Sequence, residues 1–108
     1  MPQSISIVFV TSPSAAEAER LAHTLLEEQL AACVNIVPNI TSHYRWKGAI
    51  ETSSELLLII KTAEPRFDAL RSRILELHPY SVPEIIALSP SAVHQAYAEW
   101  VSSETRTS

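Results

Sequence analysis

The side chains that could bind a metal ion are few and scattered along this 108-residue chain. They are one cysteine and four histidines: Cys33, His23, His43, His78 and His94. No pair has a tight ligand spacing such as Cys-x-x-Cys or His-x-x-x-His, so one chain makes no convincing metal site. A threefold axis or a cleft between subunits could gather ligands from several chains, and thiolate with imidazole favours copper or zinc over magnesium. His78 and Cys33 are therefore candidate ligands for copper or another divalent metal, and no cofactor is required.

Each of these residues also has a purely structural interpretation. A free cysteine is among the most buried residue types, so Cys33 is expected to be a packed, inert thiol. His78 precedes a proline at a predicted helix end, where an imidazolium interacts favourably with the helix dipole and the last carbonyls. Ordinary surface positions are expected for His23, His43 and His94.

The overall charge and composition exclude several classes of protein. The formal net charge is -4, with 8 Lys and Arg against 12 Asp and Glu, and the basic residues form no cluster. Because affinity for phosphate backbones comes mainly from basic residues, no nucleic-acid partner is expected. The apolar run from Leu56 to Ile60 is far too short to span a bilayer, so no membrane partner is expected. One cysteine makes no internal disulfide, and no secretory leader pattern is found, so a cytoplasmic location is expected.

The hydrophobic pattern predicts a single domain over residues 1–101, followed by a polar, frayed tail over 102–108. The predicted order is strand, helix, strand, strand, helix, strand, plus a terminal helix. The predicted segments are a strand over Ser4–Thr11, a helix from Ser12 or Ser14 to Gln29 or Leu30, two strands within Cys33–Thr62, a helix from Thr62–Pro65 to His78, a strand over Val82–Leu88, and a short helix capped by Ser91. This order indicates an α+β, ferredoxin-like βαββαβ fold with an extra C-terminal helix.

The stretch from Cys33 to Thr62 is predicted to be one long hairpin. Gly48 is the only glycine of the chain and indicates a tight turn that needs positive φ, while Pro38 predicts a bulge or an edge position. Two arms of about fourteen residues would span roughly 45 Å. A compact chain of this length has a radius of gyration of about 13 Å and is roughly 34 Å across, so the hairpin is longer than the body of its own subunit.

A projecting hairpin with exposed aromatic residues invites aggregation unless another subunit covers it. We therefore expect an obligate oligomer. Tyr44 and Trp46 on the hairpin, together with Trp100 on the last helix, are the predicted packing anchors between subunits. Stacking of Tyr44 and Trp46 on a ligand is the alternative.

Several strings of residues resemble the CutA divalent-cation-tolerance family, in that family's order and across almost the whole chain. They are LAACVNI (30–36), SHYRWKGAIE (42–51), ELLLIIKT (55–62), HPYSVPEI (78–85) and YAEWV (97–101). The resemblance implies a ferredoxin-like subunit assembled into a tight homotrimer through long hairpins, similar in architecture to the PII-type signalling proteins. It also implies an association with tolerance to copper and other divalent metals.

The chain departs from the family at two positions associated with copper. Some members carry a cysteine near the end of the first strand and a second histidine just before the His-Pro-Tyr string, and those positions correspond here to Val10 and Leu77. His78 alone remains of that set. Lys61, His78, Tyr80 and Glu84 are the candidate residues of a cleft between subunits, and an ion pair between subunits is the alternative role of Lys61 and Glu84.

The sequence therefore predicts a non-enzymatic homotrimer that binds a metal ion or a small ligand where subunits meet. The principal alternative is a small hydrolase of acylphosphatase-like fold, which would need an arginine in the loop after the first strand, where this chain offers Thr11, Ser12 and Ser14. An RNA-recognition module shares the βαββαβ order, but its sheet displays aromatic side chains where this chain has aliphatic ones apart from Phe9.

Overall fold

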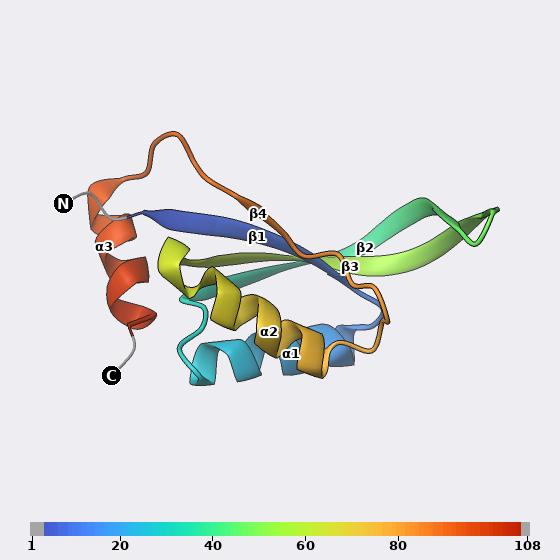
Figure 1. Cartoon of the computed structure of the whole chain (residues 1–108), viewed down its shortest axis with the longest axis horizontal. Coiled ribbons are helices and arrows are strands. Elements are labelled where there is room, and N and C mark those ends of the chain that lie inside the picture. The colour runs from blue at the N-terminus through green and yellow to red at the C-terminus, as the bar shows by residue number, and fades with distance from the viewer. Residues whose placement is uncertain (1–3, 107–108) are drawn as a thin grey trace.

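The computed structural model describes residues 4–106, which form one antiparallel sheet with helices against it (Figure 1). In chain order the elements are β1 (Ile5–Ser12), α1 (Ala15–Glu27), β2 (Cys33–Trp46), β3 (Ala49–Ala63), the 3-10 helix η1 (Glu64–Arg66), α2 (Phe67–Leu77), β4 (Ile86–Leu88) and α3 (Gln95–Glu104). The strand order β2-β3-β1-β4 confirms the predicted α+β, ferredoxin-like arrangement with its additional C-terminal helix.

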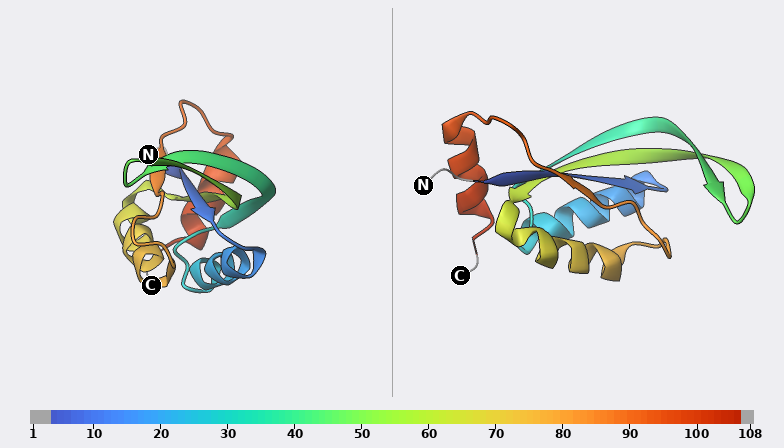
Figure 2. Two further views of the ribbon diagram at one scale, coloured as in Figure 1. Left: turned by 90° about the vertical axis from the view of Figure 1, so that its right-hand side faces the viewer. Right: turned by 45° about the horizontal axis from the view of Figure 1, so that its top comes forward.

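One face of the sheet is covered by α1 and α2, and the core lies between them (Figure 2). Strand alternation directs Val8, Val10, Leu58 and Ile60 toward the helices, where all four are fully buried. The amphipathic helices complete the core, with Leu25 among the residues that they bury.

The opposite face of the sheet has little covering it within the chain. The register pairs Phe9 of β1 with Ile59 of β3 and with Ile86 of β4, so these side chains share that face. Ile86 remains 48% exposed and Leu88 46% exposed. An apolar sheet face open to solvent is a typical surface for contact with another chain.

The long hairpin of β2 and β3 extends beyond the rest of the molecule (Figure 1). β1 pairs with β3 only from Leu56 to Ala63, so the distal half of the hairpin has no neighbouring strand among the described residues. The molecule measures 48 × 27 × 22 Å in consequence. At the tip, Lys47 (φ 50°) and Gly48 (φ 82°) both have positive φ, which is the two-residue type I′ turn typical of hairpins. The predicted glycine turn and projecting hairpin are confirmed.

The bulge predicted from Pro38 is also present. β2 takes three steps from Val37 to Ile40 while β3 takes two from Leu57 to Glu55, so one extra residue lies in β2. Asn39 has a φ of 60° at this point, a conformation that asparagine tolerates better than most residues. The bulge lies where the hairpin leaves the main sheet.

The segment after α2 differs from the prediction. The last strand contains only Ile86–Leu88, instead of beginning at Val82. Pro83 has no backbone N–H to donate to a neighbouring strand. The chain before Ile86 reaches the base of the hairpin, where the Tyr80 side chain is bound, and its strand pairing with β1 begins only at Ile86.

The helix boundaries also need three corrections. α1 ends at Glu27, because Gln29 turns into positive φ (58°). α3 begins at Gln95 and not at Ser91, and its N-cap residue, His94, makes no side-chain capping hydrogen bond. The predicted domain boundary at residue 101 is too early, because α3 continues to Glu104 and the buried Thr105 Oγ1 donates to the Val101 carbonyl at 2.8 Å. The end of the predicted tail, 107–108, lies outside the described residues, and among those that are described no helix has the length and hydrophobicity needed to cross a membrane.

Candidate ligand pocket at the base of the hairpin

A cavity of about 790 Å³ lies where the hairpin leaves the sheet and the segment after α2 crosses it. Its walls come from the end of β1, from both strands of the hairpin and from the segment Pro79–Glu84, which we call the crossing segment. The lining residues are Thr11, Ser42, His43, Tyr44, Trp46, Glu51, Glu55 and Pro79–Glu84. We call this cavity the hairpin pocket. Segments far apart in sequence therefore form one recess that is large enough for a small molecule.

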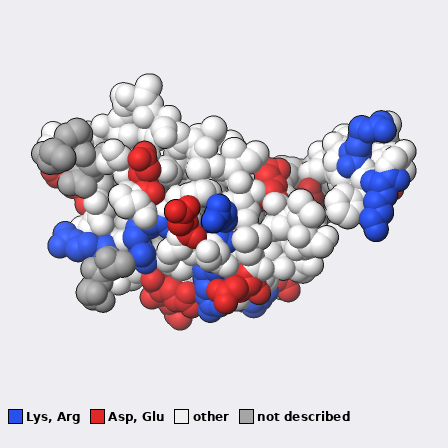
Figure 3. Space-filling view, in the orientation of Figure 1, with Lys and Arg blue, Asp and Glu red and all other residues white. Residues whose placement is uncertain are grey.

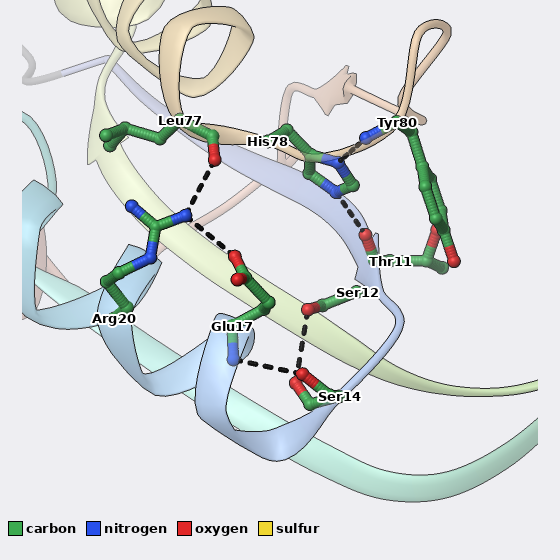
Figure 4. A network of polar contacts seen from close by, with 8 residues as sticks. All are labelled: Thr11, Ser12, Ser14, Glu17, Arg20, Leu77, His78 and Tyr80. Atoms are coloured by element: carbon green, nitrogen blue, oxygen red, sulfur yellow. Dashed lines mark hydrogen bonds and ion pairs between the residues drawn. The ribbon is translucent and has the colours of Figure 1, made fainter.

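His78 positions the crossing segment against β1 (Figure 4). Its Nε2 lies 2.7 Å from the Thr11 carbonyl oxygen, and its Nδ1 lies 3.1 Å from the Tyr80 backbone nitrogen. A carbonyl only accepts and an amide N–H only donates, so Nε2 carries the proton and Nδ1 accepts. The buried ring therefore contacts Thr11 and Tyr80 and not, as was predicted, the last helix carbonyls, and it ties two segments together.

Tyr80 connects the same segment to the hairpin. Its hydroxyl donates to Glu55 Oε2 at 2.7 Å, and its ring lies 4.8 Å from that of His78 between centroids. Burial raises the pKa of Tyr80 well above its usual value, and the hydrogen bond to Glu55 and the charge of that carboxylate raise the pKa further. The phenol thus keeps its proton and remains a donor.

Glu55 is the site residue that sequence reasoning missed. It is only 7% exposed, although it opens β3's apolar run and precedes Leu56. A single carboxylate next to a hydrophobic run was the available signal, because burying a charge is costly without a partner. Its partner Tyr80 lies 25 residues away, and no local pattern indicates that pairing.

The turn after β1 is organised by capping and an ion pair (Figure 4). Ser14 Oγ accepts from the Glu17 backbone N–H at 3.2 Å, as predicted from the capping-box spacing. Arg20 donates to Glu17 Oε2 at 2.7 Å and to the Leu77 carbonyl at 2.8 Å, which links α1 to the end of α2. The arginine nearest this turn is therefore engaged in structural contacts, which gives no support to the acylphosphatase-like alternative.

Lys61 and Cys33 lie in another part of the sheet. Lys61 pairs with Ile7 in the register, four residues before Thr11 on β1, which is roughly 13 Å along the strand. Its Nζ contacts Asn35 Oδ1 and lies 4.0 Å from Cys33 Sγ. Of the four predicted cleft residues, Tyr80 and Glu84 line the hairpin pocket, His78 supports it from behind, and Lys61 lies apart within the chain.

The thiol of Cys33 is half-buried and not packed in the core as expected. It interacts with the Tyr97 hydroxyl from α3, whose pKa is raised by burial first and then by the charge and hydrogen bond of Cys33. Trp100 stacks near Tyr97 at 5.6 Å and is 43% exposed, so it lies with α3 and not with the hairpin anchors. Tyr44 and Trp46, in contrast, line the hairpin pocket.

A copper ion held by His78 and Cys33 does not fit a single chain. Both ring nitrogens of His78 are already hydrogen-bonded, and within residues 4–106 no three His, Cys, Asp or Glu side chains lie close enough to hold one ion. Val10 is fully buried and Leu77 packs against the core, so apolar packing occupies the two positions that the resemblance associates with copper.

Comparison with known proteins decides the family. A family model described as "CutA1 divalent ion tolerance protein" matches residues 6–104. This chain belongs to that family. The CutA protein of Thermus thermophilus is 46% identical over 99 residues, covering 92% of this chain and 96% of its own length. The chloroplastic CutA 1 of Oryza sativa is 47% identical over 102 residues, covering 94% of this chain and 58% of that longer protein.

Solved structures of the family confirm the fold. The crystal structure of CutA1 from Oryza sativa has a TM-score of 0.94 against this chain, with 45% identity, and the match covers 99% of this chain and 98% of that one. The resemblance inferred from the five sequence strings is confirmed. In this CutA chain hydrogen bonds link His78 through Tyr80 to Glu55, and Glu84 lines the same pocket as Tyr80 and Glu55.

Proposed function

We propose that this CutA chain acts as a cytoplasmic homotrimer that binds a small ligand or a divalent metal ion at clefts between subunits and catalyses no reaction. The observation that carries the proposal is the hairpin, which projects beyond its own subunit with an open pocket at its base. The family description of divalent ion tolerance supports the association with metals.

The exposed side chains of the hairpin support assembly with other copies. Tyr44 is 41% exposed, Trp46 45% and Ile50 73%, and all three lie on the distal half of the hairpin. Aromatic residues are enriched in the cores of interfaces between subunits, and these cores are more apolar than the rest of the surface. A second copy that covers them would also protect the free strand edges of the hairpin from uncontrolled pairing.

The uncovered face of the sheet supports the same assembly. Phe9 and Ile59 are half-buried there, and β4 adds the exposed Ile86 and Leu88 at the sheet edge. Three copies arranged around an axis would bury these faces together and place each hairpin against a neighbour. The hairpin pocket would then lie at the boundary between two subunits.

Metal binding, in this proposal, takes ligands from more than one chain. A single chain offers no compact set of ligands among its described residues, and symmetry can bring together His or Cys side chains that are far apart within each copy. Copper or zinc is favoured over magnesium if Cys33 takes part, because thiolate is a soft ligand.

Hydrodynamic mass and turnover assays test this proposal. Three chains of 12.0 kDa give a particle of about 36 kDa, and replacing Trp46 and Ile50 with serine should shift the population toward monomer. Replacing the exposed Leu75 of α2 with serine is the control, because it removes an exposed apolar side chain outside the hairpin. Clear turnover in a hydrolase screen would contradict the non-enzymatic role.

A further inference from the structure

We propose that the hairpin pocket binds an organic polycation of the polyamine class. This inference rests on the proposed function in one respect, namely that this pocket is a ligand site, and it adds the chemistry of the ligand. It follows from the charge of the pocket wall, from the isolation of one buried carboxylate, from the aromatic rings, and from the distance between the acidic groups.

The wall of the pocket is acidic. Glu51 and Glu55 project from β3, and Glu84 projects from the crossing segment. The described residues of the lining include no lysine and no arginine, and His43 is their only imidazole. The basic side chains of the hairpin, Arg45 and Lys47, lie at its tip on either side of Trp46 in the sequence and are not among the lining residues (Figure 3). A recess whose lining carries three carboxylates and no lysine or arginine attracts positively charged ligands.

Glu55 shows that this charge lacks a counterion. Its side chain is more than nine-tenths buried, its carboxylate accepts from the Tyr80 hydroxyl, and no ion pair joins it to any residue within 4–106. A phenol that keeps its proton donates a hydrogen bond and supplies no positive charge. Because a buried charge is costly unless it is paired, a cation entering the pocket would gain more here than at a surface carboxylate.

The aromatic side chains of the pocket suit an ammonium group. Tyr44, Trp46 and Tyr80 all line it, and the faces of such rings attract cations within about 6 Å of the centroid. Trp46 already has such a contact with an amine of the chain itself, since Lys47 Nζ lies 5.8 Å from the ring centroid. The aliphatic segments between ammonium groups would pack on the same rings.

The spacing of the carboxylates favours a polyamine over a metal ion. Glu51 and Glu55 lie four residues apart on the same face of β3, so about 13 Å of strand separates their backbones. No three acidic, histidine or cysteine side chains of the described chain converge on one point, as a metal ion would require. A flexible chain with several ammonium groups can reach carboxylates that one ion cannot reach together.

Calorimetric titration with spermidine tests the proposal on the intact protein. Putrescine and the uncharged 1,4-butanediol are titrated in parallel, to separate the effect of charge from that of the carbon chain. The variants are Glu55→Gln, which removes the buried charge, and Glu84→Gln, which removes an exposed charge of the same pocket. Glu19→Gln is the matched control, because Glu19 is an exposed carboxylate of α1 outside the pocket and changes the net charge equally.

Wild type and Glu19→Gln are expected to bind spermidine alike, Glu55→Gln to bind about tenfold or more weakly, and Glu84→Gln about two- to fivefold more weakly. Thermal unfolding of each variant shows whether it is folded. If Glu55→Gln does not fold, the spermidine affinity of Glu84→Gln tests the proposal. Equal affinities in all four proteins, binding of butanediol as strong as that of putrescine, or displacement of spermidine by equimolar Mg²⁺ would overturn the proposal. Sedimentation of the same samples measures the oligomeric state independently of ligand binding. A trimer that does not bind spermidine rejects this inference alone, whereas a monomer rejects the proposed assembly.

Discussion

Replacing Tyr80 with phenylalanine removes one hydroxyl from the contact that attaches the crossing segment to the hairpin. The ring and its stacking on His78 remain, so the change isolates the 2.7 Å hydrogen bond to Glu55. Glu55 is 7% exposed, so water reaches its carboxylate only from the side of the hairpin pocket and replaces the lost donor incompletely. The carboxylate would thus be left buried without its donor.

The expected cost follows from the charge of the acceptor. A hydrogen bond to a charged group contributes about 1.5–3 kcal/mol, whereas a neutral one contributes about 0.5–1.5 kcal/mol. Tyr80→Phe should therefore lower the free energy of unfolding by about 1.5–3 kcal/mol. Tyr44→Phe is the matched control: its hydroxyl pairs with Ser53 Oγ at 2.7 Å in an exposed neutral contact, so we expect about 0.5 kcal/mol.

Urea denaturation at one fixed chain concentration measures both losses, because assembly makes stability depend on concentration. In a Glu55→Gln background the acceptor is neutral, so the same Tyr80→Phe change should cost only about 0.5–1.5 kcal/mol. Equal losses for Tyr80→Phe and Tyr44→Phe would refute the assignment of a buried charged acceptor. An undiminished loss in the Glu55→Gln background, where a neutral amide replaces the carboxylate, would refute it as well.

The pH dependence gives a second readout of the same contact. The pKa of Tyr80 is raised in the folded state, first by burial and then by Glu55, above its ordinary value of 10.0. A raised pKa means that the stabilisation is fully present below pH 10 and is lost as the pH rises toward the folded pKa. The advantage of wild type over Tyr80→Phe should therefore be constant near neutrality and shrink in strong alkali.

Three further predictions concern the turn, an ion pair and the candidate metal ligand. Gly48→Ala should destabilise the folded protein by about 1–2 kcal/mol through its positive φ alone, since an added Cβ meets no atom within 4 Å. Gly48→Asn should cost less, because asparagine tolerates positive φ better. Equal losses of the two variants in thermal melts would contradict this. The hydrogen bond from Arg73 lowers the pKa of Glu28, so wild type should be more stable than Glu28→Gln above about pH 4.5. This advantage should fade in acid and at high salt. A difference in stability that does not depend on salt would argue against the ion pair. Copper titrations of wild type, His78→Ala and the surface control His23→Ala should show no loss of binding specific to His78→Ala, because both ring nitrogens of His78 are hydrogen-bonded. A loss confined to His78→Ala would show that His78 is a copper ligand.

Local features of the chain were predictable because their causes are local. Gly48 supplies the positive φ of the turn, Pro38 marks the bulge, and Ser14 lies three residues before Glu17 at the start of α1. Each of these depends on residues within one turn or one strand. The order of the elements followed from the same patterns, and with it the ferredoxin-like sheet.

The composition of the pocket was less predictable because it depends on contacts between distant segments. His78 reaches Thr11 across 67 residues, and Tyr80 reaches Glu55 across 25. Lys61 belongs to the same family string as Glu55, but along the strand it lies near Cys33 and away from the pocket. The shortened β4 has the same origin, since the contact between Tyr80 and Glu55 holds the chain just before Ile86 at the base of the hairpin.

The central claim is that the hairpin is completed by neighbouring copies of this chain. Sedimentation equilibrium at micromolar concentration measures it most directly. We predict a single species of about 36 kDa, three times the 12.0 kDa chain, that persists on dilution. A stable species of 12.0 kDa with the hairpin exposed would contradict the claim.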